Sequence, residues 1–375
     1  MKKVLCLCNT YFQLAVLIQM RKNLLKEHRV DLLLSDHSVN ASIVADRLRH
    51  ENVFDSVTLA CTKEDDTKQK GIFQEMGSAL LVGTAQVPPW VMRFKDEKYD
   101  EFLFFNVGMS TLALYYTLKK SAPDLVCAIY EEGIFNYSAP QLLLQNDKLP
   151  GRVRLAEKMN VLRGRKSILQ DVQAFYCMYP QLYQGPLPIC QIPACDAADI
   201  QTILKSVFFT DDAKTEYPQK YIYLSSICDF DGGASIHELE LVKHIAMLVG
   251  EDELLIKVHP RDDPERFRRE GLTVAENSVV PWEVIQMGLD EKRHVLLTAT
   301  SASILSGSLM THKAVKAAFL HPLCDCEENK LAQRSISSLM SVLEKMGDVP
   351  ELKNVHICTD VKQIVSIART SADRN

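Results

Sequence analysis

The sequence has none of the short motifs that mark several common classes of nucleotide- and metal-dependent enzyme. No GxGxxG segment follows the first expected strand, and GxxxxGK[ST], HExxH and GxSxG are absent as well. Such motifs cradle phosphates, bind zinc or expose a nucleophilic serine. Their absence argues against a dehydrogenase, a P-loop kinase, a zincin protease and an α/β-hydrolase.

Strong basic charge and long apolar runs are also missing. The 375 residues carry a formal net charge of −5, whereas a nucleic-acid-binding protein would have a strongly basic domain. No run reaches the roughly 18 apolar residues of a membrane-spanning helix. At the N-terminus, Asn9, Thr10 and Gln13 arrive before the core of a signal peptide could form. We therefore expect a cytoplasmic protein that binds no nucleic acid.

The eleven cysteines follow neither a disulfide nor a zinc pattern. Their odd number and scattered positions fit reduced thiols. The pairs Cys6 with Cys8 and Cys324 with Cys326 lack zinc-ribbon spacing and a second half that would complete four ligands. The sequence therefore predicts no metal site.

Strands and helices are expected to alternate along the first part of the chain. The strands are expected at 4–8, 30–34, 53–59, 102–107 and 125–130, and the helices at 10–25, 41–49, 68–81 and 110–120. This alternation is typical of a parallel sheet covered by helices. A basic stretch at 151–177 is expected to be helical, and this first Rossmann-like domain would span 1–178.

A linker is predicted over 179–219, because prolines and glycine interrupt it at Pro180, Gly185, Pro186, Pro188 and Pro193. The alternation resumes over 220–375, the expected second Rossmann-like domain. Its strands are expected at 221–226, 254–258, 294–297 and 314–319, and its helices at 236–248, 329–345 and 360–368. The predicted fold class is α/β, with two Rossmann-like domains facing each other across a ligand-binding cleft.

An acidic pair followed by glycine, Glu131 to Gly133, comes directly after the strand expected at 125–130. Folds of the α/β class place ligands at the carboxyl ends of their strands, and glycine lets the backbone turn there. Either Glu131 or Glu132 could accept a proton from a hydroxyl group. A solvated acidic turn would give the same residues.

A cation and an imidazole end the strand expected at 254–258. Lys257 and His259 share one face of an extended chain, and Pro260 stops the ladder after them. His259 could donate a hydrogen bond or a proton to a departing phosphate. A surface histidine in a turn is the alternative interpretation.

Two shorter signals follow towards the C-terminus. Thr300, Ser301 and Ser303 lie between a strand and a helix, where hydroxyl groups cap the helix and its amides can bind phosphate. Glu283 follows Pro281 at an expected helix start, where a carboxylate can accept hydrogen bonds from ribose hydroxyls. Helix capping and a favourable helix-end charge would also explain these segments.

In this order, the acidic pair with glycine, His-Pro, Pro-x-Glu and the Ser/Thr cluster resemble bacterial sialyltransferases of the GT-B type. The chain is most similar to the lipooligosaccharide sialyltransferase family, glycosyltransferase family 52. The segment from Asn9 to Leu14 resembles that family's opening Thr-Pro-[Tyr/Phe]-Gln-Leu, with Tyr11 in place of proline. The resemblance covers both halves, from Val4 to about Phe319. It implies a GT-B-like fold, with 1–178 as the acceptor-side domain and 220–375 as the nucleotide-sugar-binding domain. It also implies transfer of sialic acid from CMP-sialic acid to lipooligosaccharide or capsule.

The resemblance also implies roles for single residues. His259 would assist the departure of CMP, Ser301 with Thr300 or Ser303 would bind its phosphate, and Glu283 would hold its ribose. Lys257 and Pro260 would complete the nucleotide site. The base is open between three carboxylates, in the order Glu131, Glu238 and Asp231. The acceptor or donor loop would contain Asn9, Thr10, Gln13, Glu132 and Gly133.

The implied mechanism is an inverting displacement without a metal or other cofactor. Two alternatives are a transferase of the same fold that uses another nucleotide sugar, such as a UDP-hexose, and a non-catalytic nucleotide-sugar-binding protein. The resemblance is also compatible with a homodimer. Basic and apolar residues interleaved over 152–166 predict peripheral contact with the anionic inner face of the cell membrane, although a solvated helix face would look the same.

Overall fold

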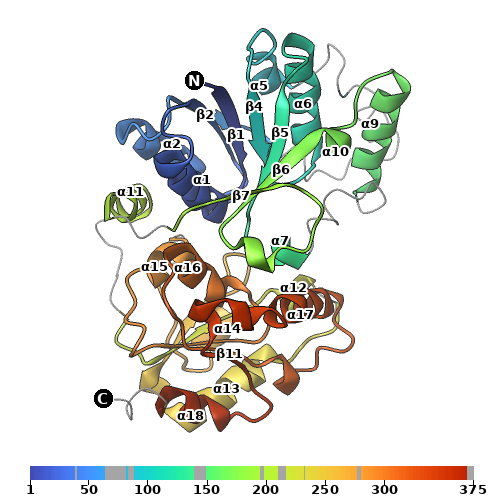
Figure 1. Ribbon diagram of the computed structural model, residues 1–375. Helices are drawn as coiled ribbons and strands as arrows, with labels where there is room; N and C mark the ends of the chain where they lie inside the picture. The colour runs from blue at the N-terminus through green and yellow to red at the C-terminus, as the bar shows by residue number, and fades with distance from the viewer. Residues whose placement is uncertain are drawn as a thin grey trace. The chain divides into compact units, whose positions relative to one another are not determined.

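The computed structural model describes residues 1–38, 40–63, 82, 88–138, 149–194, 198–209, 217–231, 233–276 and 280–369. The chain divides into two compact units (Figure 1). Unit 1 contains Met1–Glu132 and Ala139–Pro193, and unit 2 contains Gly133–Ser138 and Ala194–Asn375. Each unit is built on one sheet whose paired strands are parallel.

Among its described residues, unit 1 has a seven-stranded sheet in the order β3-β2-β1-β4-β5-β6-β7. Its strands are β1 (Lys3–Cys8), β2 (Arg29–Ser35), β3 (Ser56–Ala60), β4 (Glu101–Phe104), β5 (Val126–Tyr130), β6 (Val172–Cys177) and β7 (Ile189–Gln191). The helices are α1 (Tyr11–Asn23), α2 (Ala41–His50), α5 (Pro89–Met92), α6 (Met109–Ser121), α9 (Gly151–Leu162) and α10 (Ile168–Asp171). This is the doubly wound Rossmann order, which reverses direction between β1 and β4.

Unit 2 has five strands in its described part, in the order β12-β11-β10-β8-β9. They are β8 (Tyr221–Leu224), β9 (Leu254–Lys257), β10 (Val295–Thr298), β11 (Ala317–Phe319) and β12 (Val355–Ile357). The helices are α7 (Phe135–Ser138), α11 (Ala198–Phe208), α12 (Cys228–Asp231), α13 (Glu238–Val249), α14 (Glu265–Arg268), α15 (Trp282–Gln286), α16 (Ser303–Thr311), α17 (Lys330–Leu343) and α18 (Gln363–Arg369). This order is the second common doubly wound one, with its reversal between β8 and β10.

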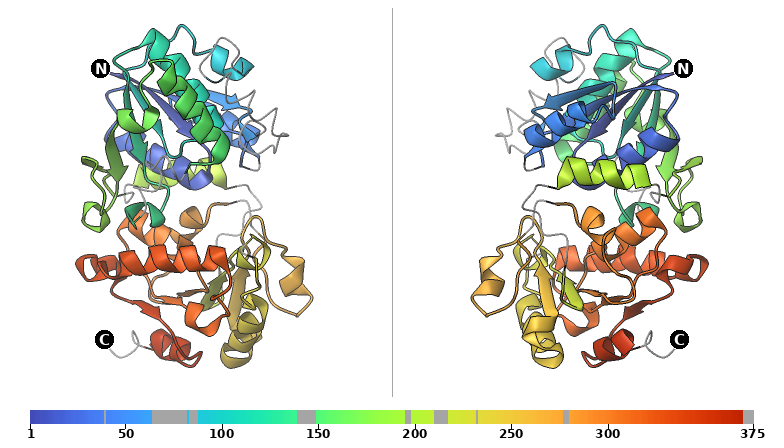
Figure 2. Two further views of the ribbon diagram at one scale, coloured as in Figure 1. Left: turned by 90° about the vertical axis from the view of Figure 1, so that its right-hand side faces the viewer. Right: turned by 90° about the vertical axis from the view of Figure 1, so that its left-hand side faces the viewer.

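The apolar strand runs form the cores because parallel strands are covered on both faces. Helices flank the sheets (Figures 1 and 2). In unit 2, α13 and α18 pack against one face of the strands through residues such as Ile245 and Ile364, both fully buried. Helices α15, α16 and α17 lie on the opposite side (Figure 1). Two α/β units with parallel sheets confirm the predicted fold class, while the cleft between them stays a prediction.

The main differences from the expected elements concern the middle of the chain. Only 151–162 and 168–171 of the stretch expected to be helical are helices, and 172–177 is strand β6. The predicted linker carries β7, which extends the sheet of unit 1, and α11, whose buried Ile200 and Leu204 belong to unit 2. The helix expected at 68–81 lies outside the described residues.

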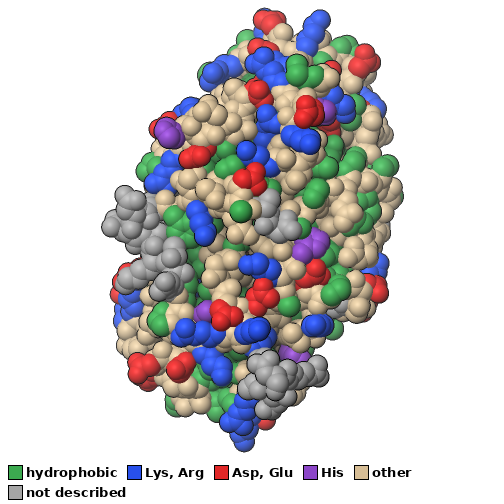
Figure 3. Space-filling view, turned by 60° about the vertical axis from the view of Figure 1, so that its left-hand side comes forward, with side chains coloured by type: hydrophobic (Ala, Val, Ile, Leu, Met, Phe, Trp, Pro, Cys, Tyr) green, Lys and Arg blue, Asp and Glu red, His purple; other side chains and the backbone are tan. Residues whose placement is uncertain are grey.

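The surface and the helices give two further findings. Acidic and basic side chains are interspersed over the face in Figure 3, as the small net charge suggests. Within the residues that the structure describes, no helix has both the length and the apolar character to cross a membrane.

Candidate functional site

In unit 2 the predicted nucleotide residues gather where the strand order reverses. The loops after β8, β9 and β10 leave the same edge of the sheet, because all three strands are parallel. Thr298 at the end of β10 donates a hydrogen bond to the carbonyl of Leu224 at the end of β8, with an O–O distance of 2.8 Å. Doubly wound sheets bind ligands at the carboxyl edge beside such a reversal. This edge of the sheet is therefore the candidate ligand site of unit 2.

His259 is held by its own loop and by the loop after β8. Its backbone amide donates to Ser225 Oγ at 2.9 Å, and its Nδ1 accepts a hydrogen bond from the amide of Arg261 at 3.1 Å. A backbone N–H can only donate, so Nδ1 is unprotonated and the proton of the neutral ring is on Nε2. Protonation of Nδ1 would place its N–H beside the N–H of Arg261, and this hydrogen bond could not form. The loop thus prepares His259 to donate a hydrogen bond through Nε2.

The hydroxyl cluster after β10 divides into a buried and an accessible part. Thr300 is buried, and its Oγ1 lies 3.4 Å from Cys228 Sγ. Ser301 and Ser303 are half-buried, and the amide of Ser301 donates to Thr298 Oγ1 at 3.0 Å. The N-cap of α16, Ala302, has no side-chain acceptor for the first-turn amides. Ser301 and Ser303 are therefore the better candidates for contact with a phosphate.

Glu283 in the first turn of α15 and Lys257 at the end of β9 attract each other electrostatically. Burial raises the pKa of Glu283 to about 7, and the nearby Lys257 opposes that rise. Burial likewise lowers the pKa of Lys257 to about 8, against the attraction of Glu283. A ligand with hydroxyl groups and a phosphate would find both an acceptor and a cation in this pair.

A buried glutamine fixes α15 to α16, the two helices that carry Glu283 and Ser303. Gln286 accepts a hydrogen bond from the amide of Gly307 at 3.1 Å and donates to Ser308 Oγ at 2.7 Å. The helices approach so closely that a Cβ at position 307 would lie 2.5 Å from Gln286 Oε1. This contact sets the position of the candidate ribose residue relative to the hydroxyl cluster.

Unit 1 has a polar cluster at its own reversal, between β1 and β4. Gln13 Nε2 donates to Glu132 Oε1 at 2.7 Å, and the Thr10 hydroxyl donates to the same oxygen at 3.4 Å. Asn9 Nδ2 donates to Asn106 Oδ1 at 3.3 Å, which joins the loops after β1 and β4. The four predicted side chains Asn9, Thr10, Gln13 and Glu132 thus lie together.

The two adjacent glutamates have different surroundings. Glu131 is buried, and its Oε2 accepts a hydrogen bond from the amide of Met178 at 2.9 Å. Glu132 is half-buried, and desolvation raises its pKa to about 8 although Gln13 and Thr10 oppose the rise. Gly133 follows with φ +124°, a conformation that side chains rarely adopt, so the backbone turns there as expected. The geometry thus favours Glu132 over Glu131 as a proton acceptor.

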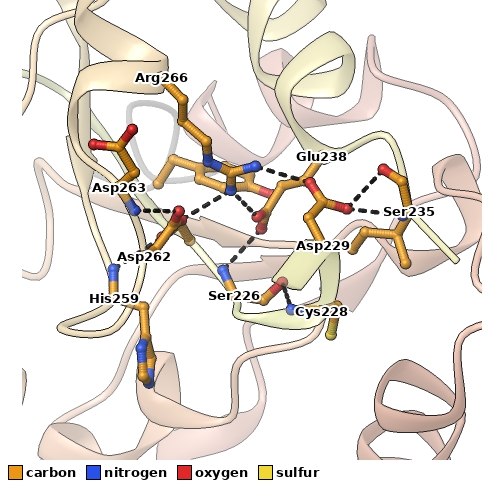
Figure 4. Close-up of polar contacts among 12 residues, drawn as sticks. Ser226, Cys228, Asp229, Ser235, Glu238, His259, Asp262, Asp263 and Arg266 are labelled. Atoms are coloured by element: carbon orange, nitrogen blue, oxygen red, sulfur yellow. Dashed lines mark hydrogen bonds and ion pairs between the residues drawn. The ribbon is translucent and has the colours of Figure 1, made fainter. Parts of the chain in front are cut away.

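The structure encloses Glu238 in the interior of unit 2. It is fully buried as the first residue of α13, where Ser226 and Arg266 donate hydrogen bonds to it (Figure 4). Tyr223 donates a further hydrogen bond to Glu238. Such a carboxylate cannot reach an acceptor hydroxyl, which removes Glu238 from the candidates for the base. Asp231 ends α12, and its side chain lies outside the described part of the chain.

Some residues of these sites had no signal in the sequence. Asn106, Ser225 and Arg266 each hold a predicted residue in place but belong to no motif. Asn106 and Ser225 lie inside the strands expected at 102–107 and 221–226, whereas β4 ends at Phe104 and β8 at Leu224, so the expected bounds hid these two loop residues. Within the described residues, no group of three or more metal-binding side chains lies together.

Comparisons with known proteins give a likeness in fold. No protein-family model matches the chain, and no curated protein sequence matches it. Among solved structures, it is similar to an α/β-galactoside α-2,3-sialyltransferase from the luminous marine bacterium Photobacterium phosphoreum. The two share 12% identity over 96% of this chain and 98% of that chain, with a TM-score of 0.50.

Two further solved structures cover nearly the whole chain. One is a UDP-glucosyltransferase from Polygonum tinctorium, with a TM-score of 0.47, 10% identity, and coverage of 99% of this chain and 94% of that chain. The other is MurG from Acinetobacter baumannii, with a TM-score of 0.44, 10% identity, and coverage of 99% and 95%. The chain shares with the sialyltransferase structure an α/β fold, here made of two units that are each built on a parallel sheet.

Proposed function

We propose that the protein is an inverting glycosyltransferase that takes its sugar from a nucleotide donor, and that the donor is CMP-sialic acid. The observation that carries the proposal is the edge of unit 2. There the strand order reverses, and hydrogen bonds tie the His259 loop and the Ser301 loop to the loop after β8. The resemblance of the motifs to family 52 supports sialic acid as the sugar and lipooligosaccharide or capsule as the acceptor.

The leaving phosphate is the group that unit 2 is suited to receive. As the bond between the sugar's anomeric carbon and the phosphate oxygen breaks, negative charge collects on that oxygen. His259 would donate a hydrogen bond to it through Nε2, with Ser301 and Ser303 as further donors. Glu283 would accept hydrogen bonds from the ribose.

Unit 1 would supply the base. The acceptor hydroxyl loses its proton to Glu132 while its oxygen forms the new bond to the anomeric carbon. CMP leaves with the electron pair of the broken bond. A raised pKa makes the ionised carboxylate of Glu132 a stronger base, and this carboxylate forms as the pH rises through about 8. No step needs a metal ion, so activity in excess chelator should equal activity without it.

Calorimetry with free nucleotides tests the nucleotide assignment. CMP is expected to bind, and more tightly than UDP or GDP. Ser301→Ala should weaken that binding by about tenfold, the value of a charge-assisted hydrogen bond. Tighter binding of UDP would replace CMP-sialic acid with a UDP-sugar, and binding of no nucleotide would contradict the whole assignment.

We also propose that the end of α9 touches an anionic membrane. Leu162 and Val161 are 79% and 50% exposed, and the exposed Lys158 lies one turn before them. These three residues line a hollow of about 540 Å³. Part of the basic stretch is used internally, because Lys166 pairs with Asp171. Flotation with anionic liposomes should depend on Leu162, and equal flotation of Leu162→Asp would exclude this contact.

A further inference from the structure

Arg266 binds three carboxylates from three separate parts of unit 2 (Figure 4). Its guanidinium lies 2.8 Å from oxygens of Asp229 in α12, Glu238 in α13 and Asp262 in the loop after β9. The side chains of Glu238 and Asp262 are fully buried, and those of Arg266 and Asp229 are nearly so. Of these four residues, the sequence had singled out only Glu238.

From Asp262, the cluster reaches the backbone of His259. Asp262 Oδ2 accepts hydrogen bonds from Arg266 and from Ser225 Oγ, the latter at 2.9 Å. The same Ser225 oxygen accepts the hydrogen bond from the amide of His259, also at 2.9 Å. Ser225 is therefore a single-atom bridge between the buried ion cluster and the candidate leaving-group residue.

From Glu238, the cluster reaches the neighbouring loop. Glu238 Oε2 accepts from Arg266, and its Oε1 accepts from the amide of Ser226 at 2.9 Å. One guanidinium thus holds the loops that follow two adjacent strands, β8 and β9.

One cation for three carboxylates is an unusual way to stabilise a fold. Desolvation costs largely offset the attraction in such clusters, and apolar side chains of similar size often serve stability equally well. Burial raises the pKa of Glu238 to about 7 and also raises the pKa of Asp262, which shows how strongly desolvation acts here. Charge-assisted hydrogen bonds do, however, fix directions and distances between backbone segments.

We propose that Arg266 and Ser225 are positioning residues that hold the imidazole of His259 in its donating orientation. The proposal rests on the proposed function of His259. Arg266 sets Asp262, Asp262 orients the Ser225 hydroxyl, and that hydroxyl fixes the amide of His259. The turn that follows then brings the Arg261 amide onto Nδ1. Neither positioning residue touches the substrate.

A double-mutant cycle tests the proposal through activity. Ser225→Ala removes the bridging hydroxyl and leaves all three ion pairs of Arg266 in place. We expect kcat for donor hydrolysis to fall about tenfold, with the KM for the donor and the melting temperature near the wild-type values. In a His259→Ala background the same change should have no further effect on kcat. An equal loss in both backgrounds, or no loss in either, would overturn the proposal.

Arg266→Lys keeps the charge but loses the planar fork, so it should lower kcat while leaving the protein folded. The matched control is Lys243→Met, which removes a cation from the exposed ion pair with Glu270 in the same unit. The control should leave kcat unchanged. A loss of kcat in the control equal to that in Arg266→Lys would mean that any lost ion pair has this effect, and would contradict the proposal.

A spectroscopic measurement separates this proposal from the proposed function. In protein labelled with ¹⁵N-histidine, the ring nitrogens of His259, assigned with His259→Gln, should report an unprotonated Nδ1 and a protonated Nε2. Ser225→Ala and Arg266→Lys should both mix the two tautomers. An unchanged pattern in both variants would refute the positioning role. The expected pattern in a protein that hydrolyses no nucleotide sugar would support the positioning and reject the transferase.

Discussion

Replacing His259 by three different side chains distinguishes hydrogen bonding from proton transfer. Alanine removes the ring and therefore its Nε2 donor. Glutamine places an amide N–H near the position of Nε2 but has no acceptor for the Arg261 amide. Asparagine offers an acceptor near the position of Nδ1 and has no donor near Nε2. Each variant thus isolates one function of the imidazole.

The magnitudes follow from the two hydrogen bonds involved. Loss of one donor to an oxygen that gains charge in the transition state lowers kcat by about 10² to 10³, or about 3 to 4 kcal/mol. His259→Ala and His259→Asn should both show this loss. Loss of the bond from Arg261, a neutral backbone interaction, is worth about 1 kcal/mol. His259→Gln should therefore remain within about tenfold of the wild type.

Initial rates of donor hydrolysis give kcat and KM, and thermal melting checks that each variant is folded. If His259→Gln is as slow as His259→Ala, the imidazole transfers a proton and the reasoning from the Nδ1 contact is refuted. If His259→Asn retains full activity, the residue only shapes its loop.

Three further predictions concern protonation and packing. Glu132→Gln should lower kcat by a factor of about 10² to 10⁴. Wild-type activity should rise with pH through about 8, where Glu132 loses its proton. A pH profile of activity that is flat between 6 and 9 would exclude Glu132 as the base. The raised pKa of Glu238 contributes stability below its ordinary value near 4.5, and that contribution is lost as pH rises through about 7. The free energy of unfolding, measured by urea titration, should therefore fall by on the order of 3 kcal/mol between pH 5 and pH 8. Glu238→Gln should make this free energy less dependent on pH over the same range. Gly307→Ala should cost about 1 to 3 kcal/mol of stability and weaken CMP binding, because the new Cβ would press on Gln286. The control Gly288→Ala, whose Cβ would meet only a carbonyl oxygen at 3.5 Å, should be near neutral. Equal effects of the two substitutions would contradict the close packing of α15 and α16.

The alternation of strands and helices was predictable because buried parallel strands read as short apolar runs. The strands β1, β5 and β9 lie within one or two residues of their expected bounds. The shorter strands β7 and β12, of three residues each, have no such run and were missed. Strand β6 was taken for helix because it is only six residues long and comes after a basic stretch.

The site was less predictable, because it depends on the order of strands and on which way neighbouring side chains point. Sequence places Glu131 and Glu132 side by side at a strand end, and only the fold decides that the first is buried and the second meets Gln13. In the same way, the sequence alone makes Glu238 a candidate for the catalytic base. Only the fold shows that it binds Arg266, 28 residues later in the chain. Such pairings are tertiary, and no local pattern encodes them.

The most direct test of a nucleotide-sugar site on unit 2 is a hydrolysis assay across CMP-sialic acid, UDP-hexoses and GDP-hexoses. It compares the wild type with His259→Ala and Ser301→Ala. We expect release of CMP from CMP-sialic acid, reduced at least a hundredfold in His259→Ala while the protein stays folded. Hydrolysis of no donor, or a rate that neither substitution alters, would contradict the account.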